Sequence, residues 1–117
     1  MGYFGLSHYQ QSDMASDFVY TVLEAIAEKC EKQLKLKENV YNTDGATNIA
    51  LFAESFLMDV EYHSDSRIIK VLIKARDQLI EMAKETKESE PWRDKDMHVK
   101  AYARMIKNLN KIIDGAW

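Results

Sequence analysis

Residues 67–87 read RIIKVLIKARDQLIEMAKETK, and this stretch decides the fold class. Apolar side chains recur along it every three or four residues, which is the period of an amphipathic α-helix. The apolar positions are Ile68, Ile69, Leu72, Ala75, Leu79, Ile80, Met82 and Ala83. They cover more than half of the helix circumference, so we expect this helix to be the most deeply buried element.

Three other stretches show the same period, and we expect helices over about residues 13–36, 46–62 and 94–114. Pro91 disfavours helical backbone at the residue before it, and Gly115 is a typical residue after a helix end. Four amphipathic helices joined by short connections predict an all-α fold. The expected architecture is a single domain over residues 1–117, arranged as a mostly antiparallel four-helix bundle.

The composition agrees with a folded helical protein. Hydrophobic residues make up 46% of the 117 residues and charged residues 30%, with four Gly and one Pro. The single cysteine, Cys30, excludes an intrachain disulfide and a multi-cysteine zinc site, which favours a reducing compartment and hence the cytoplasm. No stretch approaches the roughly 20 apolar residues that a membrane span needs, so we expect a soluble protein with no membrane partner.

The N-terminal leader, residues 1–12, is rich in aromatic side chains and contains two glycines. Tyr3, Phe4, Leu6 and Tyr9 carry its apolar surface. We expect the leader to pack over one end of the bundle, because burying even two of these rings stabilises the fold by several kcal/mol, as estimated roughly from buried area.

Several of these residues also carry a resemblance to a known family. The stretch Gly2-Tyr3-Phe4-Gly5, followed by Tyr9, Asp13, Ala15, Asp17 and Phe18, resembles the opening of a bacterial family catalogued as domain of unknown function 4259. The likeness continues through Ala53-Glu54 and Trp92. The resemblance implies a small cytoplasmic helical protein of bacteria or their phages, and it brings no established activity.

Charge is segregated along the chain. Residues 1–65 carry 11 Asp and Glu against 4 Lys, and residues 66–117 carry 12 Lys and Arg against 8 acids. On a helical wheel the first helix carries an acidic ridge, formed by Asp13, Asp17, Glu24, Glu28 and Glu31. The last helix carries a basic ridge within an arc of about 60°, formed by Lys100, Arg104, Lys107 and Lys111. Lys32, Lys35 or the basic ridge are the expected partners of the acids, within one chain or between chains.

Two further features point to contacts. The second helix has a core stripe formed by Ala46, Ile49, Ala50, Ala53, Phe56, Leu57 and Val60. Beside this stripe lies a second apolar side formed by Leu51, Met58 and Tyr62 with Ser55 among them. Either the leader or a flanking helix covers this side, or it binds another protein or a second copy as a homodimer.

Arg76 projects from the apolar face of the third helix, and Glu54 or Asp17 is its expected structural ion-pair partner.

Spacing gives no support for catalysis. The chain has no Glu-x-x-His motif for a di-iron site, no glycine-rich phosphate loop and no paired nucleophile and base in sequence. We therefore expect no cofactor, no metal and no catalytic residues. The favoured function is a small non-enzymatic protein-binding factor, a phage or bacterial accessory protein that inhibits or modulates a host system.

Two alternative functions remain open. The first is a metal-dependent hydrolase that binds Mg²⁺ or Mn²⁺ through Asp13, Asp17 and Glu54, and it requires these side chains to converge. The second is weak nucleic-acid binding through the basic ridge, which the acidic isoelectric point of about 5.6 disfavours.

Overall fold

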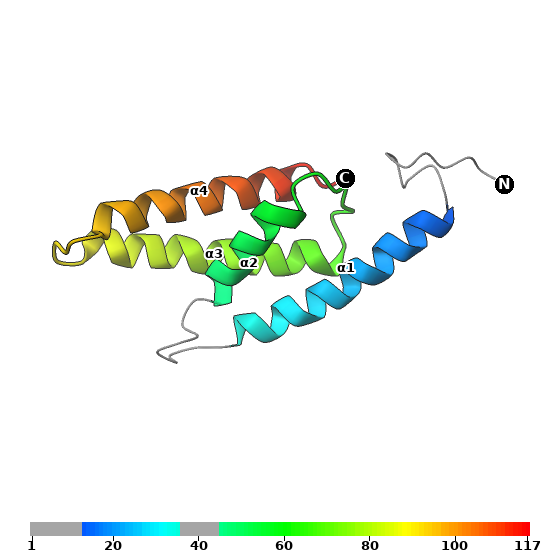
Figure 1. Ribbon diagram of the computed structural model, residues 1–117, viewed down its shortest axis with the longest axis horizontal. Helices are drawn as coiled ribbons and strands as arrows, with labels where there is room; N and C mark the ends of the chain where they lie inside the picture. The colour runs from blue at the N-terminus through cyan, green and yellow to red at the C-terminus, as the bar shows by residue number, and fades with distance from the viewer. Residues whose placement is uncertain (1–12, 36–44) are drawn as a thin grey trace.

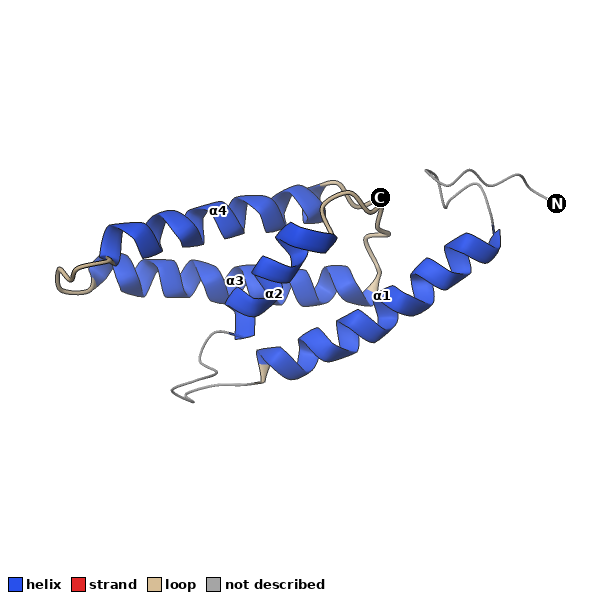
Figure 2. Ribbon diagram, in the orientation of Figure 1, coloured by secondary structure: helices blue, strands red, loops and turns tan. Residues whose placement is uncertain are grey.

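The computed structural model describes residues 13–35 and 45–117, with side chains described from Asp17 onward. The described chain forms four helices: α1 (Asp13–Leu34), α2 (Gly45–Phe56), α3 (Arg67–Glu88) and α4 (Lys95–Asp114). The described residues contain no strand (Figure 2), so the predicted all-α class is confirmed. No helix among them is long and apolar enough to cross a membrane. The leader and its expected packing lie outside the described residues.

The helices α3 and α4 form an antiparallel hairpin that contains the centre of the core (Figure 1). Leu72, Ala75 and Leu79 of α3 are fully buried, as is Leu109 of α4. Seven residues of α3 are buried, more than in any other described helix, as its sequence predicts. The ends of α3 and α4 agree with those predicted from the sequence to within about one residue, and Pro91 lies in the connection between the two helices.

The helix α2 crosses α3 and α4 obliquely (Figure 1) and buries an alanine-rich stripe against them, formed by Ala46, Ile49, Ala50 and Ala53. It ends at Phe56, six residues before the end that the sequence predicts. The apolar pattern continues past Phe56 because Leu57 and Tyr62 are both core residues reached through a turn. The Tyr62 hydroxyl donates to the Leu57 carbonyl at 2.9 Å, which closes that turn inside the core.

The helix α1 packs against α2 and α3 mainly through its C-terminal half, where Ala27, Cys30 and Leu34 are buried. The closest approach lies where α1 ends and α2 begins. A Cβ atom at Gly45 would lie 2.1 Å from the Gln33 carbonyl oxygen, so only glycine permits this contact. From this point the two helices diverge (Figure 1), and the N-terminal half of α1 extends past the bundle.

Candidate functional site

The N-terminal half of α1 exposes large apolar side chains. Phe18 is 70% exposed, Tyr20 is 63% exposed and Val22 is 39% exposed, although Phe18 and Val22 follow the helical period of the apolar residues of α1. The N-terminal half of α1 extends past the bundle (Figure 1), and Leu23 is the first described hydrophobic side chain of α1 that packs against the core. Helical periodicity identifies an apolar face, but it does not say whether another element covers that face.

An open apolar groove of about 610 Å³ continues from this face between α1 and α2. Its residues are Val22, Ala25, Ile26, Lys29, Cys30, Lys32 and Gln33 of α1, and Asn48, Ile49 and Phe52 of α2. Cys30 and Ile49 are buried and belong to the core, whereas Lys29 and Lys32 are exposed. Where α1 ends and α2 begins, the Asn48 side-chain amide donates to Gln33 at 3.1 Å. This contact links the two helices at one end of the groove, and Val22 lines the groove farther toward the N-terminus of α1.

Aromatic residues of α2 extend the apolar surface along the open side. The rings of Phe52 and Phe56 pack with their centroids 5.0 Å apart. Phe52 lines the groove, and Phe56 is 68% exposed at the end of α2. The sequence places Phe56 in the core stripe, which is wrong, because α2 ends there and its last residue lies beyond the surface that α3 and α4 cover.

The partner-binding patch predicted on α2 is not a single surface. Leu51 and Ser55 are exposed, but Met58 is half-buried and packs against the core. Tyr62 is only 3% exposed. The prediction extended the helix through residue 62, and the actual turn after Phe56 carries Met58 and Tyr62 away from the other two residues.

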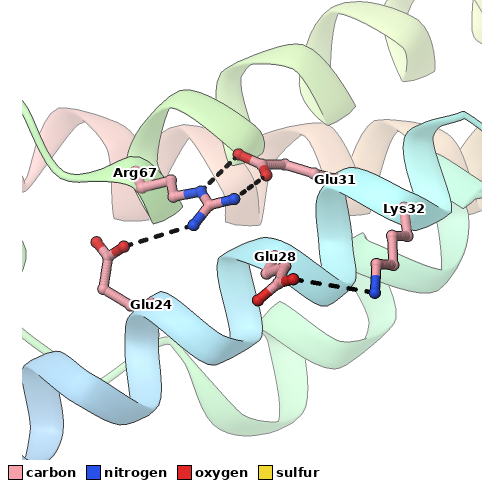
Figure 3. A network of polar contacts seen from close by, with 5 residues as sticks. All are labelled: Glu24, Glu28, Glu31, Lys32 and Arg67. Atoms are coloured by element: carbon pink, nitrogen blue, oxygen red, sulfur yellow. Dashed lines mark hydrogen bonds and ion pairs between the residues drawn. The ribbon is translucent and has the colours of Figure 1, made fainter.

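The acidic ridge of α1 binds the start of α3 through Arg67 (Figure 3). The Arg67 guanidinium donates to Glu31 through Nε at 2.8 Å and through Nη2, and its Nη1 lies 3.7 Å from the Glu24 carboxylate. Glu28 lies 3.9 Å from Lys32 on the same helix. Asp17 is exposed, and the side chain of Asp13 lies outside the described residues. The hydrogen bond from Arg67 lowers the pKa of Glu31 and raises the pKa of Arg67 itself.

The main partner of the acidic ridge is therefore Arg67, and the basic ridge of α4 is not involved in the described contacts. The sequence offered no local signal for this choice, because Arg67 lies 36 residues from Glu31 and reads only as the first residue of a helix. Arg67 holds α1 against α3 through Glu24 and Glu31. On the helical wheel these two acids lie on the side of α1 opposite the groove residues.

Glu54 binds α4 rather than Arg76. Its carboxylate accepts hydrogen bonds from Arg104 Nε at 2.9 Å, Arg104 Nη2 at 3.2 Å and Asn108 at 2.6 Å. Arg76 instead contacts Asp77 at 3.2 Å and Asn110 at 3.1 Å. The predicted pairing of Arg76 with Glu54 or Asp17 is wrong, because α2 directs Glu54 toward α4 while Arg76 reaches along α3 and across to α4.

The carboxylates of the alternative metal site are not gathered among the described side chains. Glu54 is engaged by Arg104 and Asn108, and Asp17 is exposed on the projecting half of α1. No group of three or more His, Cys, Asp or Glu side chains in the described residues is placed to hold a metal ion. Burial, with a smaller contribution from Glu31, raises the pKa of the Cys30 thiol, which therefore stays protonated at neutral pH.

The basic ridge of α4 is divided between two environments. Arg104 binds Glu54, whereas Lys100 is exposed. Lys107 and Lys111 lie with Lys87 along a second, shallow groove between α3 and α4. One residue of the basic ridge, Arg104, thus pairs with an acid of the same chain, whereas its three lysines are exposed.

Comparisons of the chain with protein-family models, with curated proteins and with solved structures find no match. The resemblance to domain of unknown function 4259 stays a prediction from the residues quoted for it. The geometry of the described residues is therefore the basis for assigning a function.

Proposed function

We propose that this chain is a non-enzymatic protein-binding factor whose contact surface is the projecting half of α1 together with the α1–α2 groove. The observation that carries the proposal is the exposure of Phe18 on α1 and Phe56 on α2, the two helices that form an apolar groove. Scattered exposed apolar residues are normal, but aromatic side chains gathered around a groove are typical of interaction surfaces.

The groove has the features of a site for an amphipathic helix. Its inner surface is apolar, from Val22 and Ile26 on α1 to Ile49 and Phe52 on α2. Its exposed rim carries Lys29 and Lys32. A partner helix with an apolar face and neighbouring acidic residues would bury its apolar side chains in the groove and place its carboxylates beside these lysines.

The biological setting that we propose is the bacterial cytoplasm, where the chain acts as a bacterial or phage accessory protein that inhibits or modulates a host system. The resemblance of the leader and first helix to a bacterial family supports this setting. Support for a reducing compartment comes from Cys30, the only cysteine of the chain, which is a free and buried thiol.

Site-specific photo-crosslinking in bacterial cells tests the surface. A benzoylphenylalanine residue replaces Phe18, Phe56 or, as a matched control, Met97, which is exposed on α4 away from the groove. We expect crosslinked protein adducts from positions 18 and 56, with little adduct from position 97. Equal adduct formation at all three positions, or none at positions 18 and 56, would contradict the proposed surface.

A further inference from the structure

The exposed face of α1 has the spacing of a coiled-coil seam. Phe18, Val22, Ala25 and Lys29 follow one another at intervals of four, three and four residues, so they form one stripe along the helix. All four are exposed, and the stripe lies on a different side of α1 from the core residues Ala27, Cys30 and Leu34. The helix therefore carries two apolar faces, of which the described chain covers one.

Charges beside the stripe differ between its two ends. Asp17 lies at the N-terminal end and makes no ion pair with the described residues. Lys29 and Lys32 lie at the C-terminal end, where Lys32 makes only an exposed contact with Glu28. Two such helices side by side in antiparallel order place the acidic end of each beside the basic end of the other. Parallel order places like charges together, which is unfavourable.

The side-chain sizes favour the same order. Ala25 is the smallest residue of the stripe and lies near its middle, where two crossing helices approach most closely. With residue 22 of one helix beside residue 25 of the other, Phe18 of each copy lies beside Lys29 of its neighbour. This position is on the α1–α2 groove, which Phe52 also lines.

We propose that a second copy of this chain occupies the groove, with the two α1 helices packed antiparallel and each Phe18 inserted beside the Lys29 and Phe52 of the other copy. This inference rests on the proposed function, because it names the partner of the same surface. Each copy contributes one Phe18 and one groove, so the same contact is made twice and the two copies are related by a two-fold axis. Such an interface forms a dimer and leaves no free site for a third chain.

Solution mass tests whether the pair exists. For the full chain we expect twice the 13.6 kDa of one chain in sedimentation or light-scattering measurements at micromolar concentration. Phe18→Lys should weaken association by about tenfold or more, because it places a positive charge at a buried aromatic contact, beside Lys29 of the other copy. Met97→Lys is the matched control and should leave the mass unchanged. Circular dichroism checks that both variants stay helical, as the exposure of both side chains predicts.

Disulfide trapping tests the order of the helices. Residues 17 and 32 of one helix are about 22 Å apart, so they meet only between antiparallel copies. A mixture of Asp17→Cys and Lys32→Cys chains should form a mixed disulfide, whereas Asp17→Cys alone should not link to itself. The wild type controls for Cys30, which is buried. A disulfide between two Asp17→Cys chains would overturn the antiparallel order.

The outcomes separate this inference from the proposed function. A monomeric mass at high concentration overturns the second copy as the partner. If position 18 of that monomer then crosslinks to a different protein, the binding surface stands and only its partner changes. If position 18 crosslinks to the leader of its own chain, the inference fails and the leader is the occupant. A dimeric mass that Phe18→Lys leaves unchanged also overturns the inference.

Discussion

Glu54 is the residue whose environment most clearly links a single side chain to helix packing. Its carboxylate on α2 accepts three hydrogen bonds from Arg104 and Asn108 of α4. Burial raises the pKa of Glu54, but these hydrogen bonds and the Arg104 charge together outweigh burial, so the pKa lies below its usual range. The ionised carboxylate is therefore the form that holds α2 on α4.

Replacing Glu54 by Gln should lower stability in a pH-dependent way. Because the folded-state pKa of Glu54 is below the unfolded value of about 4.3, its contribution is complete above that value and is lost as the pH falls through the folded pKa. At pH 7 we expect Glu54→Gln to lower the free energy of unfolding by about 1 to 2 kcal/mol. Urea denaturation should show this difference shrinking below pH 4.

A double-mutant cycle controls this prediction. In an Arg104→Met background, Glu54→Gln should cost less at pH 7, because its main hydrogen-bond donor is already missing. The role assigned to the ionised pair would be contradicted if Glu54→Gln lowered the free energy of unfolding by the same amount at pH 7 and pH 3, with and without Arg104→Met.

At the scale of the helix, local signals in the sequence predicted α3 and α4 well and α2 poorly. Pro91 lies in the connection between α3 and α4 and acts through a backbone preference that needs no tertiary contact. Gly115 directly follows α4, although its backbone there is right-handed helical. The end of α2 depends on the Tyr62 hydroxyl reaching the Leu57 carbonyl within the core. Such a contact forms only in the folded chain, and the apolar pattern alone extends the helix past it.

The candidate site shows the same limit of sequence reasoning. An apolar face on α1 was predictable from periodicity, and the acids and lysines beside it were predictable from the helical wheel. Which part of that face stays exposed was not, because exposure of Phe18 depends on how far α1 extends past α3. Arg67 was missed for a related reason, since its partners lie on another helix.

Arg67 fixes the position of α1, so its loss should loosen that helix before the others. Its contacts with Glu24 and Glu31 are the described ion pairs that join α1 to α3. We expect Arg67→Met to accelerate amide hydrogen exchange several-fold along α1, while exchange in α3 and α4 stays slow. Arg93→Met, at a side chain that is 95% exposed, is the control and should change neither. Uniform acceleration in all four helices would instead show that Arg67 supports the whole core.

Across the whole molecule, the last residue of the chain joins segments that are distant in sequence. The Trp117 backbone N–H donates to the Tyr62 carbonyl at 3.0 Å, and the Ser64 N–H donates to the Trp117 carbonyl at 2.7 Å. The Trp117 ring is largely exposed and contacts the His63 ring edge-on, with centroids 4.7 Å apart. The end of α4 is thereby attached to the connection between α2 and α3 (Figure 1).

This attachment should depend on the backbone of residue 117 more than on its ring. Deletion of Trp117 removes both hydrogen bonds, and we expect the free energy of unfolding to fall by about 1 to 3 kcal/mol. Trp117→Ala keeps both bonds and removes a mostly exposed ring, so it should cost less than half as much. Denaturation followed by circular dichroism measures both variants. Equal losses would mean that the ring contact with His63, and not the backbone pairing, holds the end of α4 to the loop that positions α2 beside the groove.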